Sequence, residues 1–96
     1  MLHILMNSPF KNNNINRFSK MIDFFDDFLA IQDGVIISLK NNYFIKLIKS
    51  LTKNLYVLEE DLLARGFRKN ISSIFFVINY EQFVFLTVKN KKQISW

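Results

Sequence analysis

Four short apolar runs divide the chain, and each predicts a buried strand. They cover residues 2–6, 28–31, 55–58 and 74–78, and the last run is the most hydrophobic stretch of the sequence. Each run stops at polar or turn-forming residues, as buried strands do. Because continuous apolar runs are typical of strands covered on both faces, we expect a parallel sheet in which residues 74–78 form a central strand.

The first two segments between these runs show helical spacing. Apolar residues three or four positions apart predict two helices, the first through Ile15, Phe18, Ile22 and Phe25 and the second through Phe44, Leu47, Ile48 and Leu51. The asparagines at positions 12–14 favour the start of the first helix. Asp26 and Asp27 are expected to end it, and Lys46, Lys49 and Lys53 to face solvent on the second.

Two further helices are predicted from their terminal residues. Glu59, Glu60 and Asp61 would occupy the first turn of a short helix, with a cation, Arg65, in its last turn and Gly66 just beyond. Asn79 and Gln82 have the spacing of a capping box and predict a helix over residues 80–88. The Phe, Val and Thr content of that segment would also suit a strand. Residues 32–34 are expected to form a turn.

Strands that alternate with helices predict an α/β fold, a three-layer sandwich with a mostly parallel sheet of four to five strands. Ninety-six residues suffice for a single domain, residues 1–96, with no linker. In such sheets function gathers at the carboxyl ends of the strands. Those ends carry Asp33, Gly34, Glu59, Glu60 and Asp61.

The composition excludes several kinds of chemistry. The chain contains no cysteine, so it has no disulfide, no thiolate metal site and no thiol nucleophile. Two glycines cannot build a phosphate-binding loop. The single histidine, His3, lies in a predicted strand, where a hydrogen-bonded core residue is expected. We therefore expect no catalytic residue, no cofactor and no metal, and we attribute the acidic residues at 59–61 to the helix dipole rather than to acid/base catalysis.

A formal net charge of +5 raises the alternative of a small basic module that contacts RNA. The abundance of Lys, Asn, Ile and Phe is also expected from an AT-rich gene, which would make the charge incidental. Phe83 and Phe85 occupy apolar-pattern positions, which favours core or interface packing over stacking on bases. No apolar run is long enough to cross a bilayer, so we expect a soluble, cytoplasmic protein.

Four blocks of the sequence are similar to the TusB/DsrH family across nearly the whole chain. They are Met1-Leu2-His3, residues 31–35 (IQDGV), residues 58–66 (LEEDLLARG) and residues 83–96. The resemblance implies a DsrE-like fold and a non-catalytic subunit of the TusBCD sulfur relay, which supports 2-thiolation of the tRNA wobble uridine. It implies TusC- and TusD-like partners in a dimer of heterotrimers, a heterohexamer that receives sulfur from a TusA-like protein and passes it to a TusE-like protein.

The resemblance also indicates where sulfur would be carried and why this chain does not carry it. In TusD the sulfur-carrying cysteine lies between the third strand and the next helix, a few residues before an Arg-Gly pair. This chain has Arg65-Gly66 there but Leu58 and Glu59 at the level of the cysteine. Its role would then be structural or allosteric, and the expected partner-facing residues are Asp33, Gly34, Glu59, Glu60, Asp61 and Trp96.

Overall fold

The computed structural model describes residues 1–11 and 14–96 and contains a five-stranded sheet in which every pairing is parallel. The strand order is β4-β3-β2-β1-β5. The strands are β1 (Leu2–Leu5), β2 (Asp27–Ala30), β3 (Asn54–Leu58), β4 (Phe76–Ile78) and β5 (Gln93–Ser95). The predicted α/β fold is confirmed, and the sheet is entirely parallel where a mostly parallel one was expected.

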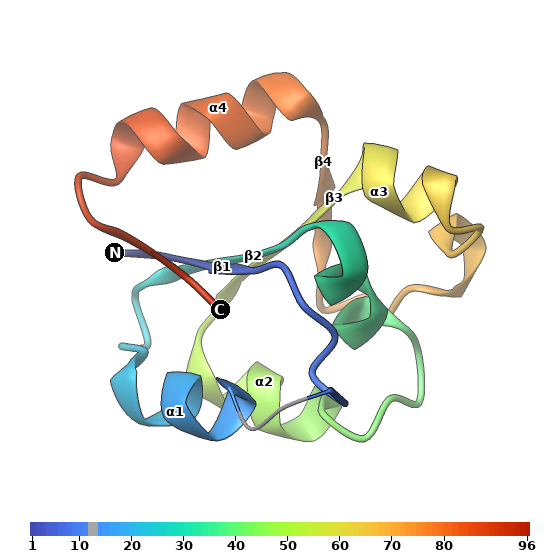
Figure 1. Ribbon diagram of the computed structural model, residues 1–96, viewed down its shortest axis with the longest axis horizontal. Helices are drawn as coiled ribbons and strands as arrows, with labels where there is room; N and C mark the ends of the chain where they lie inside the picture. Colours follow the sequence, from blue (N-terminus) through green and yellow to red (C-terminus); the bar gives the residue numbers. More distant parts are fainter. Residues whose placement is uncertain (12–13) are drawn as a thin grey trace.

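Helices cover the two faces of the sheet unequally. Helices α1 (Asn14–Met21) and α2 (Ile45–Leu51) lie on one side, and α4 (Tyr80–Lys89) lies on the other (Figure 1). Buried side chains pack on both sides. The core under α1 and α2 includes Phe18, Phe28 and Ile48, and the core under α4 includes Leu29 and Leu86. The sheet therefore separates two hydrophobic cores, as in a three-layer sandwich.

The carboxyl end of the sheet is closed by α3 (Glu59–Ala64) and by a 3₁₀ helix, η1 (Gln32–Ser38). A second 3₁₀ helix, η2 (Arg68–Asn70), follows α3. The predicted turn at residues 32–34 is the start of η1. The 3₁₀ helix itself was not predicted from the sequence. Short 3₁₀ segments have no long periodic pattern by which they could be recognised.

The structure confirms the predicted end of α3 and the predicted start of α4. The Gln82 backbone N–H donates to Asn79 Oδ1 and the Asn79 N–H donates to Gln82 Oε1, both over 2.9 Å, so residues 79–82 form a capping box. Gly66 follows α3 with φ +70°, a conformation that favours glycine. The predicted asparagine cap of α1 depends on residues 12 and 13, which lie outside the described residues.

The prediction of a central fourth strand is wrong. Strand β4 is at the edge of the sheet, it contains three residues, and Ile74 and Phe75 precede it. Phe75 is buried under the α2 side, but Phe76 points to the α4 side and is 62% exposed. Ile78 at the end of β4 packs in the core under α4, whereas Phe76, two residues earlier on the same side of the sheet, lies outside that core.

Two predictions around the first helix are also wrong. Helix α1 ends at Met21, so Phe25 lies in the following turn and is 70% exposed. The Nζ atom of Lys53 lies over the Phe25 ring, 5.0 Å from its centroid. Asp27 belongs to β2 and is buried rather than ending a helix. On α2, Leu47 is exposed although its spacing placed it with the apolar face.

Candidate functional site

The carboxylates expected at the end of the sheet are brought together in part. Arg65 reaches Asp33 at 3.1 Å and Asp61 at 3.5 Å. The other oxygen of Asp61 accepts the backbone N–H of Gln32 at 2.7 Å, where Gln32 has φ +51°. Asp61 thus ties the start of η1 to α3 and stabilises a left-handed residue that is not glycine. The result is a brace between two segments that follow neighbouring strands.

Glu59 and Glu60 have different partners from Asp61. Glu59 pairs with Arg68 at 3.5 Å, and Glu60 accepts the backbone N–H of Tyr80 at 3.0 Å. Glu60 therefore links α3 to the first turn of α4, where a negative charge is favourable to the helix dipole. Each of these predicted carboxylates has a partner among the described residues, which explains them structurally.

Gly34 is buried at the end of β1, and close packing explains the need for glycine. A Cβ at this position would lie 2.1 Å from the carbonyl oxygen of Leu5 and 2.7 Å from its carbonyl carbon. The same Leu5 oxygen accepts the backbone N–H of Ile31 at 3.0 Å. Gly34 thus allows η1 to pass directly against the strand.

Trp96 lies far from this cluster and packs against the core under α1. Its ring lies edge-on to Phe18, and its Nε1–H donates to His3 Nδ1 at 3.3 Å. His3 is fully buried, and its Nε2 lies 3.0 Å from Asp26 Oδ2. Because an indole nitrogen can only donate, Nδ1 is the acceptor and Nε2 carries the proton that is shared with Asp26. The expectation of a hydrogen-bonded core histidine is confirmed.

The pKa of Asp26 is set by this network. Burial acts to raise it, but hydrogen bonds from the Asp23 backbone, the His3 ring and the Met1 ammonium, together with the charge of that ammonium, lower it by more. The pKa of Asp26 therefore lies below its ordinary value, and the carboxylate stays charged into acidic solution. This ion links β1 to the turn before β2.

The carboxylate of the neighbouring Asp27 is buried, and the sequence analysis did not predict its contacts. Its Oδ2 accepts from Lys89 Nζ at 3.3 Å and from Asn90 Nδ2 at 2.9 Å, while Oδ1 is buried without a partner. These bonds hold the C-terminal end of α4 to the start of β2. The only available signal in the sequence was the carboxylate itself at the start of an apolar run.

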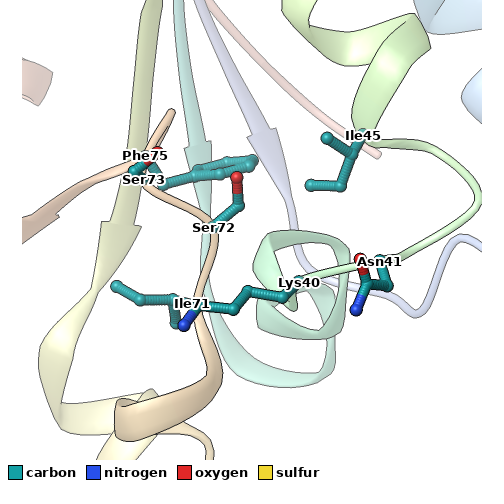
Figure 2. Close-up of a pocket in the computed structure, with 7 residues that line it drawn as sticks. All are labelled: Lys40, Asn41, Ile45, Ile71, Ser72, Ser73 and Phe75. Atoms are coloured by element: carbon teal, nitrogen blue, oxygen red, sulfur yellow. The ribbon is translucent and has the colours of Figure 1, made fainter.

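A hollow of about 640 Å³ on the described surface contains none of the predicted site residues. Figure 2 shows its lining beside η1 and the N-terminal end of α2. Ile45, Ile71 and Phe75 supply apolar surface, and polar groups come from Lys40, Asn41, Ser72 and Ser73. It has one cation and no acid/base pair, so no reaction is indicated there.

The carboxyl end of the sheet presents ion pairs and contacts to backbone N–H groups. Leu58 ends β3 and Glu59 follows it, and the sequence contains no thiol. Within residues 1–11 and 14–96, no cluster of histidine and acidic side chains is suited to hold a metal ion. Every helix in the same part of the chain is too short or too polar to cross a membrane.

Comparisons with known proteins agree on one family. The family model described as "DsrH like protein" matches residues 7–93. "Protein TusB" of Buchnera aphidicola subsp. Schizaphis graminum is 58% identical over 96 residues, the full length of both chains. "Protein TusB" of Erwinia tasmaniensis is 40% identical over the same full length. A protein of unknown function from Methanobacterium thermoautotrophicum has a similar structure, with TM-score 0.64 and 12% identity over 99% of this chain and 96% of that one. The last likeness concerns the fold alone.

Proposed function

The chain belongs to the TusB/DsrH family, and on this premise we propose how it acts. Its function is that of a TusB subunit of the TusBCD sulfur relay in tRNA 2-thiouridine synthesis. The observation that carries this conclusion is the full-length match at 58% identity to a protein with that name. The chain contributes to the relay as residues 1–96 folded into one unit.

Within the relay the chain is a non-catalytic subunit. A persulfide needs a thiolate that attacks the incoming sulfur and then holds it, and neither a carboxylate nor an alkyl group can do this. The chain has no cysteine, and Glu59 follows β3 where a carrier would hold its thiol. The reactive cysteine is therefore on a partner chain of the TusD type.

The partners are TusC- and TusD-like chains in a dimer of heterotrimers, which works in the cytoplasm. The complex takes sulfur from a TusA-like protein and passes it to a TusE-like protein. In this arrangement the carboxyl end of the sheet, with Asp33 and residues 59–61, faces the partners and holds the cysteine loop of the TusD-like chain in a receptive shape. Gly34 is buried and contributes by letting η1 pack against β1. The brace through Arg65 supports this role because it connects η1 to α3 at that end of the sheet. Trp96 supports it from the opposite edge by holding β5 to the core.

The test is co-expression of the chain with its TusC- and TusD-like counterparts, followed by light scattering on the purified material. The proposal predicts one stable complex with equal amounts of the three chains, and little loss of binding between about 50 and 200 mM salt. A free monomer beside an intact complex of the other two would contradict it. Steep loss of a tRNA complex over the same salt range would favour the RNA-contacting alternative.

A further inference from the structure

The outward surface of α4 differs from that of the other two long helices. On α1 and α2 the exposed positions include Arg17, Lys20, Lys46 and Lys49. On α4 the exposed positions include Tyr80, Val84, Phe85 and Val88. Its exposed charges are Glu81 in the first turn and Lys89 in the last, and Lys89 pairs with Asp27. A surface helix normally turns polar residues to water. Helix α4 thus presents apolar residues on the side that faces away from its own core.

This surface continues onto the uncovered end of the sheet. Phe76 of β4 packs against Tyr56 of β3, with 6.0 Å between ring centroids, and both rings lie on the α4 side. Tyr56 and Phe85 line a hollow of about 190 Å³ between α4 and these strands. We call the exposed or half-buried side chains of Tyr56, Phe76, Tyr80, Val84, Phe85 and Val88 together the α4 face. Its hollow is too small for a drug-sized ligand but suits one inserted side chain.

The size and composition of the α4 face match the apolar centre of a subunit interface. Tyr80, Phe76 and Phe85 are 61%, 62% and 68% exposed. At roughly 200 Å² per aromatic side chain, the three rings alone present about 400 Å², half of what one partner buries in a standard interface. Aromatic residues are enriched and charges depleted at the centre of interfaces. These three rings are therefore the expected anchors.

Charge decides what kind of partner fits. Two copies of a chain with net charge +5 repel each other, which disfavours a second copy as the occupant. Exposed lysines at positions 89, 91 and 92 border the C-terminal end of the α4 face. An acidic partner would be attracted by these lysines and steered to the apolar centre.

We infer that the α4 face is the surface through which this chain docks a sister subunit of the relay, one with net negative charge and an apolar side chain that enters the hollow beside Phe85. This inference rests on the proposed function, because the sister subunits supply the occupant. It adds three features to the proposed function: the surface that binds the sister subunit, the anchor residues on that surface, and the net charge of the sister subunit.

The test compares two phenylalanines of nearly equal exposure in the co-expressed complex. Phe85→Asp places a charge at the centre of the α4 face, whereas Phe25→Asp places one in the turn before β2, where Phe25 is 70% exposed. Phe85→Asp is expected to weaken binding to the sister subunits by at least about 30-fold, and Phe25→Asp by less than about twofold. Circular dichroism of each variant checks that both remain folded. In the wild-type complex, hydrogen exchange is expected to slow at α4 and not at α1.

A paired charge reversal, Lys91→Glu with Lys92→Glu, tests the sign of the partner. It is expected to slow association at low salt by about tenfold. Faster association would overturn the inference that the partner is acidic.

The remaining outcomes are distinguishable. If the wild type assembles and Phe85→Asp assembles equally well, the α4 face is overturned and the proposed function stands. If the wild type forms no complex with the sister chains, the proposed function fails and this inference fails with it. If Phe85→Asp breaks a self-associated form and leaves the mixed complex intact, a second copy occupies the face and the inference is overturned.

Discussion

The packing of Gly34 against β1 leads to a quantitative prediction for Gly34→Ala. The added methyl would meet the Leu5 carbonyl oxygen at 2.1 Å, well inside any tolerated contact, and the neighbour is backbone that cannot rotate away. Overpacking of this kind costs about 1–3 kcal/mol. Movement of the Leu5 oxygen would also weaken its 3.0 Å hydrogen bond from Ile31, for about 1 kcal/mol more. The expected loss is therefore about 2–4 kcal/mol.

The assay is urea and thermal unfolding followed by circular dichroism, with Gly66 as the matched control. In a chain of this size each kcal/mol shifts the melting temperature by about 4–8 °C, so Gly34→Ala is expected to melt roughly 8–32 °C lower than the parent. At Gly66 a Cβ would meet nothing within 4 Å, and only its φ of +70° opposes alanine. Gly66→Ala is expected to cost about 1–2 kcal/mol. A Gly34→Ala variant that is as stable as Gly66→Ala would refute the packing argument.

Three further predictions concern the buried network and the edge of the sheet. The pKa of Asp26 is lowered in the folded state, so the Asp26 carboxylate stabilises the fold above its unfolded pKa, and this stabilisation is lost as the pH falls through its folded pKa. Asp26→Asn should therefore make the free energy of unfolding depend less on pH in acid. An unchanged pH profile would argue against this. Trp96→Phe keeps a ring but leaves His3 Nδ1 without a donor, so urea unfolding should show a loss of about 1–3 kcal/mol, and parental stability would contradict the hydrogen bond. Phe76→Asp should change the stability by less than about 0.5 kcal/mol, because the Phe76 side chain is exposed. If residues 74–78 formed a central strand, the same substitution would abolish folding. An unfolded variant would therefore favour the central position.

Local signals in the sequence predicted most of the elements. The capping box at Asn79 and Gln82, the acidic first turn of α3 and the glycine after it each depend on residues within a few positions of one another, and the structure confirms all three. The apolar runs likewise predicted β1, β2 and β3. These features are recoverable because their energetics are local.

Features that depend on the order of strands in space were not recoverable in this way. Strand β5 consists of Gln93, Ile94 and Ser95, and it has too few apolar residues to be recognised as a strand. The edge position of β4 follows from which helix covers which strands, and the hydrophobic run alone suggested a centre. A pattern of apolar residues reports burial only when something is present to cover them.

The candidate site was predicted as a set of positions but not as a network. Asp33 and Asp61 were predicted as site residues because functional residues of parallel sheets gather at the carboxyl ends of the strands. Their shared contact with Arg65 is visible only in the structure. The bond between Trp96 and His3 joins residues 93 positions apart. No periodicity within the sequence relates such residues.

A reconstituted transfer assay with labelled sulfur tests whether the chain is needed for sulfur transfer without carrying sulfur itself. The complex is assembled with and without this chain, charged by a TusA-like persulfide donor, and the label is followed on each polypeptide and on a TusE-like acceptor. We expect label on the TusD-like chain, none on this chain, and a sharp fall in transfer to the acceptor when this chain is omitted. Covalent label on this chain, or equal transfer in its absence, would show that its role in the relay is a different one.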